Sequence, residues 1–348
     1  MENRNRLSVD EWEAIKGFFE ETHMKDQKVE YWHYTSVNAV LGIFKEYISK
    51  CNDDKTYFAD KCSMYASNIR FMNDAKEYNE GESLFEELSE GDSNLAAYRE
   101  VSNDNIFLIS FCENGDLLSQ WKWYGKDSGI SIMFNLEETE YCTISNYNDK
   151  GEKLDKQFWD KHTKPLSVKY KEGDKTNYYN KLMGENILKT SKAYNLIKPA
   201  FVPFCKDESF FDEHEHRLVF YTCNLADSKD RRPRFNIVYN DKEKGRIKPA
   251  LDVVFRVPKE KKNVISRIMV GPGNNQEMVF NFLIHLFDRS NYFYHPSLNV
   301  RKGEEIKWNN FLHENGVSLV ECEDGKKRIC YKCENGIVIM KSAIPFRE

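Results

Sequence analysis

The sequence predicts an α+β protein, and two observations lead to this fold class. Short apolar runs typical of strands recur along the 348 residues, and "NIFLISFC" (105–112) is apolar almost throughout, as buried strands are. Amphipathic helical patterns lie among these runs without the strict alternation of strand and helix that produces a doubly wound parallel sheet. Apolar residues make up 40% of the chain and aromatic residues 14%, which is enough to build a packed core.

The N-terminal segment, residues 1–28, is predicted to hold a helix. Ser8 and Glu11 form an S-x-x-E capping box, and apolar residues follow at helical spacing from Trp12 to Phe19. A strand is expected over residues 29–34, and Ser36 is placed to cap the helix after it. Because no linker-like stretch interrupts the remainder, we expect residues 29–348 to form a single elaborated domain.

The later segments continue this mixture of elements. Residues 64–71 are expected to form a strand or turn, and helices are expected over 75–88, 176–198 and 275–287. Further strands are expected at 128–136, 215–223, 236–240, 250–257 and 264–271. The C-terminal runs "VSLVEC", "KRICYKC" and "GIVIMKSAIPF" also have strand character, so the end of the chain is expected to be rich in strands.

Composition and charge narrow the class of protein. A formal net charge of −5 argues against a protein that coats nucleic acid, although it allows a local basic patch. The chain has nine cysteines, an odd number, and several lie in apolar runs, so we expect reduced thiols rather than a disulfide framework. The N-terminus lacks the apolar core of a signal peptide, and no run of about 18 apolar residues occurs. These features predict a cytoplasmic protein with no membrane partner.

Two segments near the N-terminus place polar side chains where elements meet. In "WHYTS" (32–36), His33 is either a core histidine or part of one wall of a binding site, and Ser36 can cap the next helix in both cases. In "RFMNDAKEYNEGE" (70–82), Asn73 and Asp74 are suited to a turn that starts a helix. A helix cap and a site wall are compatible, so the residues alone leave both interpretations open.

The segment "LISFCENGDLLSQWKWYGKDSGISIMF" (108–134) gathers aromatic side chains between two predicted strands. Trp121, Trp123 and Tyr124 follow one another closely just before a glycine-containing turn. Aromatic rings with polar tips line pockets for flat ligands, and they are equally common in cores. The segment is therefore a candidate pocket wall with a packing role as its alternative.

A later segment, "DESFFDEHEHRLVF" (207–220), carries alternating charges. Alternation places Glu213, Glu215 and Arg217 on one face of a strand, with His214 and His216 on the other. Two carboxylates that share a buried site push one pKa upward, whereas exposed charges have no such effect. Since the histidines point away from Glu215, we expect no metal here.

Two further groups have weaker chemical signatures. Cys322, Cys330 and Cys333 follow His313, but only one C-x-x-C pair is present, whereas a structural zinc site needs four suitably spaced ligands. A basic run between Lys229 and Lys248 is diluted by acids and fits a solvated hairpin, although it is the best candidate for contact with a phosphate backbone.

In order along the chain, these segments resemble the bacterial domain-of-unknown-function family 2971. The matching segments are "WHYTS" (32–36), "FMNDAKE" (71–77), "SFCENGDLLSQWKWYGKDSGISIMF" (110–134), "EHEHR" (213–217), "ISRIMVGP" (265–272) and "SAIPFR" (342–347). Two features depart from the family pattern. Met72 interrupts the usual F-N-D, and residues from about 299 to 333 look like an insertion.

The layout of that family is similar to that of ADP-ribosyltransferases, which have a split mixed or antiparallel sheet with flanking helices and hold NAD in a cleft. The resemblance implies a catalytic set of Glu215, His33 and Tyr124. In this set Glu215 would stabilise the positive charge that develops on ribose, His33 would position a ribose hydroxyl, and Tyr124 would stack on nicotinamide. The implied NAD-binding residues are His33, Tyr34, Thr35, Ser36, Asn73, Asp74, Trp121, Trp123, Tyr124, Glu213 and Arg217.

The resemblance therefore implies an enzyme that cleaves the nicotinamide–ribose bond of NAD and transfers ADP-ribose to a nucleic acid or protein. A role as a toxin or antiphage effector, with an antitoxin or defence partner, is implied by the same family. Three alternatives stay open: an NAD glycohydrolase with water as acceptor, a non-catalytic nucleotide-binding sensor, and a nuclease. In the nuclease, Asp74, Glu77, Glu213 and Glu215 would hold a divalent ion.

Overall fold

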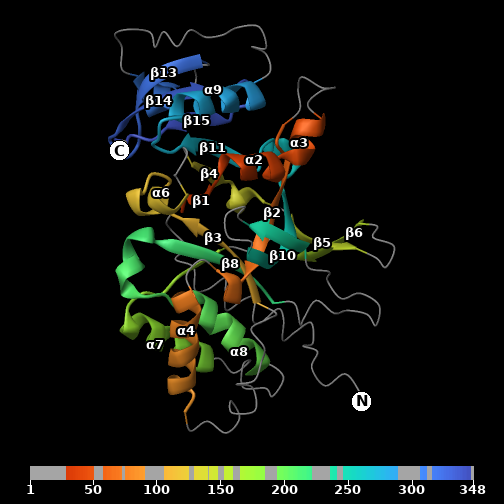
Figure 1. The fold of residues 1–348 in the computed structure, drawn as a ribbon, viewed down its shortest axis with the longest axis vertical. Helices are drawn as coiled ribbons and strands as arrows, with labels where there is room; N and C mark the ends of the chain where they lie inside the picture. The colour runs from red at the N-terminus through yellow and green to blue at the C-terminus, as the bar shows by residue number, and fades with distance from the viewer. Residues whose placement is uncertain are drawn as a thin grey trace. The chain divides into compact units, whose positions relative to one another are not determined.

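A computed structural model describes residues 29–50, 58–72, 75–90, 106–124, 129–139, 141–147, 153–159, 165–184, 194–221, 236–240, 246–288, 306–311 and 316–345. The fold is α+β, as the sequence predicted, with an open mixed sheet and helices (Figure 1). The predicted N-terminal helix within residues 1–28 lies outside the described residues. None of the helices in the described segments is long and apolar enough to cross a lipid bilayer.

The chain divides into two compact units, each assembled from segments that are distant in sequence. The first unit contains Tyr65–Ser110 and Cys142–Val253, and the second contains Val29–Met64, Phe111–Tyr141 and Val254–Glu348. The expectation that residues 29–348 act as one domain stays a prediction. We describe each unit by itself.

The second unit is built on a mixed sheet. Its strands are β12 (Ile306–Lys307), β13 (Gly316–Glu321), β14 (Lys327–Lys332), β15 (Val338–Lys341), β11 (Ile265–Val270), β4 (Ile130–Phe134) and β1 (Tyr31–Thr35), hydrogen-bonded in that order. β11 and β15 run parallel, whereas β4 is antiparallel to both β11 and β1. The expected insertion at 299–333 thus supplies β12, β13 and β14, and these strands extend the sheet beyond β15.

Local chemistry explains the helices of this unit. Ser36 caps α2 (Val37–Ile43), accepting a hydrogen bond from the Ala39 backbone N–H at 3.3 Å, which confirms the predicted cap. α3 (Lys45–Lys50) follows α2, and α6 (Leu118–Tyr124) and α10 (Trp308–Phe311) are short. α9 (Gln276–Phe287) matches the predicted amphipathic helix and packs against β11 and β15 through buried residues such as Phe280 and Leu283.

The first unit contains three of the described α-helices. α4 (Ala75–Leu88) matches its prediction, and the expected helix over 176–198 corresponds to α7 (Glu172–Gly184) and α8 (Tyr194–Phe201), with residues 185–193 outside the described set. The strands that lie wholly within it are β6 (Lys153–Trp159), β7 (Leu166–Ser167), β8 (Glu215–Tyr221) and β9 (Asn236–Asn240). Four more belong to it in part, namely β2 (Lys61–Asn68), β3 (Ile106–Cys112), β5 (Tyr141–Tyr147) and β10 (Arg246–Arg256). β8 pairs with β3 and β7, and Leu166 lies opposite Arg217.

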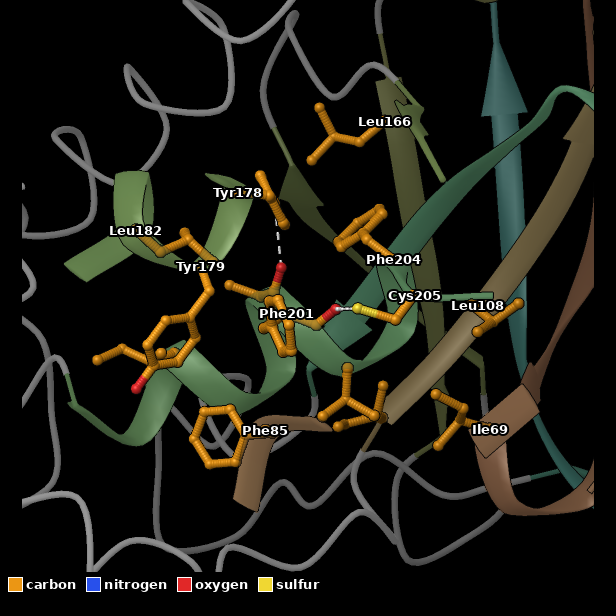
Figure 2. Packing of buried hydrophobic residues seen from close by; sticks show 14 residues of the cluster. Ile69, Phe85, Leu108, Leu166, Tyr178, Tyr179, Leu182, Phe201, Phe204 and Cys205 are labelled. Carbon is orange, nitrogen blue, oxygen red and sulfur yellow. Dashed lines mark hydrogen bonds between the residues drawn. The ribbon is translucent and has the colours of Figure 1, made fainter. Parts of the chain in front are cut away.

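The core of the first unit is aromatic where its helices meet (Figure 2). Phe201 is fully buried, and its ring contacts those of Phe85, Tyr178 and Tyr179. The Tyr178 hydroxyl donates to the Ala200 carbonyl at 3.0 Å, so the buried phenol keeps a partner. Truncating a phenylalanine in such a position costs about 3–5 kcal/mol, and this packing therefore holds α7 and α8 against α4.

Ion pairs reinforce the same helices. Lys198 on α8 donates to Glu82 on α4 at 2.6 Å, and Lys175 on α7 pairs with Glu80 on α4. Both lysines are buried. Burying a charge without a partner is costly, so each pair ties its helix to α4 in one register.

Candidate functional site

The first candidate site is a cluster of four charged side chains, Lys206, Glu213, Glu215 and Arg217, which we call the charged cluster. All four are buried. The segment that carries them leaves the 3₁₀ helix η5 (Glu208–Glu213), passes through His214 in the left-handed region at φ 42°, and enters β8 at Glu215. A non-glycine residue with positive φ is uncommon, and here it marks the change of direction at which the strand begins.

This geometry corrects one detail of the sequence interpretation. Simple alternation placed Glu213, Glu215 and Arg217 on one strand face. In the structure only Glu215 and Arg217 belong to β8, because the strand begins after Glu213. Glu213 nevertheless approaches Glu215, since the turn at His214 brings both carboxylates to one lysine.

Every oxygen of Glu215 is engaged. Arg217 donates to it twice, from Nε to Oε1 at 2.8 Å and from Nη2 to Oε2 at 2.9 Å. Lys206 Nζ donates to Glu215 Oε2 at 3.0 Å and to Glu213 Oε2 at 2.6 Å. Two-pronged arginine–carboxylate pairs are among the stronger hydrogen bonds in proteins, so the Glu215 side chain is fixed in orientation.

Backbone contacts anchor the charged cluster to its surroundings. The Arg217 Nη1 donates to the Pro203 carbonyl at 2.7 Å, and the Glu215 backbone N–H donates to the Tyr170 hydroxyl at 2.8 Å. The Lys206 ammonium also lies 4.8 Å from the centre of the Phe210 ring, a cation–π distance. The cluster therefore joins β8 to η4 (Val202–Phe204) and to the segment after β7.

The cluster controls the ionisation of Glu215. Burial alone would raise the pKa of this carboxyl, but the positive charges of Arg217 and Lys206 outweigh burial and hold its pKa well below the ordinary range. Burial and the nearby Glu215 charge raise the pKa of Tyr170, so its hydroxyl stays protonated. The ionised form of Glu215 is thus favoured in a buried setting, where two negative and two positive side chains balance.

Exposure limits what this carboxylate can do in the conformation observed. Glu215 is 3% exposed, and each oxygen already accepts at least one hydrogen bond. A ligand would reach it only after one donor moved aside. Lys206 is the donor that can move most easily. Its Nζ also donates to Glu213 Oε2 at 2.6 Å, so the ammonium keeps a carboxylate partner when it leaves Glu215.

A second polar cluster lies in the second unit and centres on Asp116. This buried carboxylate accepts from Trp121 Nε1 at 3.0 Å, Arg328 Nη2 at 3.0 Å, Ser342 Oγ at 2.5 Å and the Ala343 backbone N–H at 3.1 Å. Four donors satisfy its lone pairs. We call Asp116 and these four partners the Asp116 cluster. Through Asp116, it links α6, β14 and the residues after β15 by hydrogen bonds.

The predicted residues on β1 divide between the two faces of the sheet. Tyr34 is buried, accepts from the Leu117 N–H at 2.8 Å, donates to the Asn114 carbonyl at 2.9 Å, and meets the buried Trp121 edge-on at 4.8 Å. His33 lies on the opposite face, because successive strand residues alternate. Tyr34 and Trp121 are buried core residues, and the NAD-binding roles expected of His33, Tyr34 and Trp121 stay predictions.

His33 itself is half-buried among aromatic rings. Its ring lies edge-on to Phe111 at 6.0 Å and to Phe134 at 6.5 Å, and it faces Ile132 across the β1–β4 pair. Thr35, two residues on, shares this face. Of the aromatic residues on α6, Trp123 is 71% exposed and Tyr124 is 39% exposed, so both rings are accessible to a partner or ligand.

The proposed meeting of His33, Tyr124 and Glu215 stays a prediction, since the first two residues belong to the second unit and Glu215 to the first. Asn73 and Asp74, the Glu77 side chain and His313 lie outside the described residues. So do the first six basic residues of the run from Lys229 to Lys248, whereas its last two, Arg246 and Lys248, lie in β10. Among the side chains that are described, no group of three or more His, Cys, Asp or Glu is placed to hold a metal ion.

Lys206, Asp116 and Arg328 were not identified from the sequence as site residues. Lys206 has a weak signal, a lone cation in the apolar run "FVPFCK". Asp116 and Ser342 lie in segments that carry the family resemblance, but their meeting depends on a separation of 226 residues that local patterns do not encode. Comparison of the chain with protein-family models, with curated proteins and with solved structures found no match.

Proposed function

We propose that the protein is an ADP-ribosyltransferase-like enzyme that cleaves the nicotinamide–ribose bond of NAD and transfers ADP-ribose to a nucleic acid or protein. The observation that supports the proposal is the ionised state of Glu215, fixed by Arg217 and Lys206. Cleavage of that bond passes through a state resembling an oxocarbenium ion, which an oriented carboxylate stabilises. Such a carboxylate must keep its charge when it is desolvated, as Glu215 does.

In the proposed mechanism Lys206 transfers its hydrogen bond from Glu215 to Glu213 as NAD binds. The Oε2 atom of Glu215 then accepts from the ribose 2′-hydroxyl, while the two bonds from Arg217 keep the carboxylate in place. His33 positions a ribose hydroxyl and Tyr124 stacks on nicotinamide, the roles that the family resemblance implies. Thr35 on the same strand face as His33 assists, and Trp123 offers a second exposed ring.

The acceptor distinguishes two versions of this enzyme. With a nucleic acid or protein as acceptor, the protein modifies a macromolecule, as a toxin or antiphage effector does. With water as acceptor, it is an NAD glycohydrolase that depletes the dinucleotide. The chemistry at Glu215 is the same in both cases.

The test is a paired assay on the full chain with labelled NAD, alone and with total RNA, DNA or cell lysate. Glu215→Gln keeps the shape of the side chain and removes its charge, and Glu208→Gln is the matched control on the exposed side of η5. We expect nicotinamide release from the wild type and Glu208→Gln, and at least a hundredfold loss in Glu215→Gln. Circular dichroism checks that each variant is folded. Absence of release and of label transfer by the wild type with every acceptor would refute the proposal.

A non-catalytic binding or sensor module is the second candidate, and one observation favours it. Both oxygens of Glu215 are already saturated, and the side chain is almost fully buried, as in a cluster that only stabilises the fold. Calorimetric binding of NAD without nicotinamide release would support this candidate. If NAD does not bind, both nucleotide-based functions fail.

A further inference from the structure

The connection between β10 and β11 collects positive charge in a chain whose formal net charge is −5. From Arg256 to Lys262, a segment that we call the basic turn, the sequence has four basic residues and one acidic residue. The side chains of Arg256, Lys261 and Lys262 are exposed, and the whole segment belongs to the second unit. Among the described residues, neither Arg256 nor Lys262 takes part in an ion pair. The basic turn therefore presents a local excess of positive charge to solvent.

The backbone at the end of the basic turn has a rare conformation. Lys262 has φ 65° and ψ −59°, and the Asn263 backbone N–H donates to the Lys261 carbonyl at 2.8 Å. This is a γ-turn of the positive-φ form, which is strained for a residue that carries a side chain, whereas glycine adopts positive φ readily. Strained residues of this kind gather at sites that bind ligands, so a lysine at this position indicates a role for its side chain.

Asn263, the residue after the strained lysine, fixes the basic turn through three hydrogen bonds. It is buried, its Oδ1 accepts from the Ala59 backbone N–H at 2.9 Å, and its Nδ2 donates to the Asn335 carbonyl at 2.7 Å. Its own carbonyl accepts from Asn135 Nδ2 at 3.1 Å. Three segments that are distant in sequence thus hold the turn in one conformation. Because the backbone is already ordered, a partner that binds its lysines loses less entropy on binding.

An aromatic ring positions the Lys262 ammonium. Its Nζ lies 5.0 Å from the centre of the Phe58 ring, which is a cation–π distance. A carboxylate in this place would neutralise the ammonium, whereas a ring orients it and leaves its net charge unchanged. Since Lys262 is exposed, its N–H donors are accessible to an anion.

We propose that the basic turn binds the phosphate backbone of a nucleic acid. Lysine and arginine bind phosphate through charge and hydrogen bonds, and several cations within one turn suit a polyanion with closely and regularly spaced charges. An anionic membrane fits less well, because none of the exposed large apolar side chains among the described residues lies in this turn to enter lipid. Contacts to phosphate alone do not read the base sequence. The proposal concerns binding and does not rest on the proposed NAD chemistry.

The test is fluorescence anisotropy of the full chain with a labelled DNA duplex of about 20 base pairs, at salt concentrations from about 50 mM upward. Lys261→Gln/Lys262→Gln removes two charges from the basic turn. Lys326→Gln/Lys327→Gln, in the β13–β14 hairpin of the same unit, is the matched control at two exposed lysines. We expect the first variant to bind more weakly and to reduce the slope of log affinity against log salt by about 2, as two lost phosphate contacts require. The control should keep the wild-type slope.

Three results would overturn the proposal. One is no measurable binding of the duplex by the wild type at about 50 mM salt. Another is an unchanged slope in Lys261→Gln/Lys262→Gln, which would assign binding to a different surface. The third is stronger binding to phosphatidylserine vesicles than to the duplex.

A glycine variant separates the lysine charge from the shape of the turn. Lys262→Gly removes the ammonium and keeps the backbone conformation, because glycine adopts positive φ without strain. It should lose as much affinity for the duplex as Lys262→Gln does, and circular dichroism checks that both variants are folded. An affinity of Lys262→Gly equal to that of the wild type would also overturn the proposal.

Discussion

Replacing Lys206 by methionine tests how much the charged cluster contributes to the free energy of unfolding. Methionine keeps most of the apolar stem and removes the ammonium, which lies 2.6 Å from Glu213 and 3.0 Å from Glu215. Both contacts are buried, so solvent screens them little. The charge sum of the cluster changes from zero to −1.

Removing one partner from a buried ion pair costs about 3–5 kcal/mol, because the charge left behind stays desolvated. Arg217 retains Glu215 by two hydrogen bonds, so most of this cost falls on Glu213. We therefore expect Lys206→Met to lower the free energy of unfolding by about 3–5 kcal/mol at pH 7. Lys171→Met, at an exposed position, is the matched control and should change it by less than about 0.5 kcal/mol.

The pH dependence has a definite sign. The pKa of Glu215 is depressed in the folded state, so its stabilising contribution is complete above the unfolded value of about 4.3 and is lost as the pH falls towards the folded pKa. Acid also protonates a carboxylate that has lost its cation. The difference in unfolding free energy between wild type and Lys206→Met should therefore be largest near neutral pH and shrink below about pH 4.

The assay is urea unfolding followed by tryptophan fluorescence and circular dichroism, on Lys206→Met, Glu213→Gln and the double variant. The double variant restores charge balance, so its cost should be smaller than the sum of the single costs by at least about 1 kcal/mol. The claim that these buried charges stabilise one another would be refuted by either of two results. One is that the losses in unfolding free energy of the two single variants add up to the loss in the double variant, and the other is a loss under about 1 kcal/mol in Lys206→Met.

Two further predictions concern the second unit. An added Cβ at Gly115 would lie 2.3 Å from the Trp32 ring, so Gly115→Ala should lower the free energy of unfolding by about 1–3 kcal/mol. Gly42→Ala in α2 has open space around the new methyl group and should raise the free energy of unfolding by about 0.5–1 kcal/mol. Urea titrations of the two variants measure both changes. Tyr34→Phe removes a hydroxyl that satisfies both Asn114 and Leu117, so it should cost about 1–3 kcal/mol and speed hydrogen exchange at the Leu117 amide.

The sequence predicted local elements well where periodicity carries the information. The bounds of α4 and α9, and the placement of Glu215 and Arg217 on one face of β8, follow from helical and strand spacing. The family resemblance assigned both His33 and Tyr34 to the NAD site, and the structure places these two neighbours on opposite faces of β1.

Features that depend on distant residues were beyond local patterns. The turn at His214 displaces Glu213 from the strand, and a single histidine is only a weak signal of the left-handed conformation found there. The pairing of Asp116 with Arg328 spans 212 residues, and the role of Lys206 depends on a chain reversal through η5. Such contacts are selected by burial of charge in the folded chain, which no short window of sequence contains.

Three of the six segments that carry the family resemblance, 110–134, 213–217 and 342–347, contribute residues to the two buried clusters, and this raises the question of whether these motifs preserve chemistry or only the fold. Asp116 and Glu215 allow a matched comparison, because both are buried carboxylates with every oxygen engaged. Asp116→Asn and Glu215→Gln each exchange a carboxylate for an amide, and each should lower the free energy of unfolding by about 2–4 kcal/mol, since a buried arginine loses its counter-charge.

If the motifs serve the fold alone, the two variants behave alike in every assay. If Glu215 performs the proposed chemistry, only Glu215→Gln loses nicotinamide release per folded molecule, while Asp116→Asn retains it. A parallel loss of release in both variants, at equal folded fraction, would mean that the activity does not distinguish the two clusters and would remove the specific role assigned to Glu215.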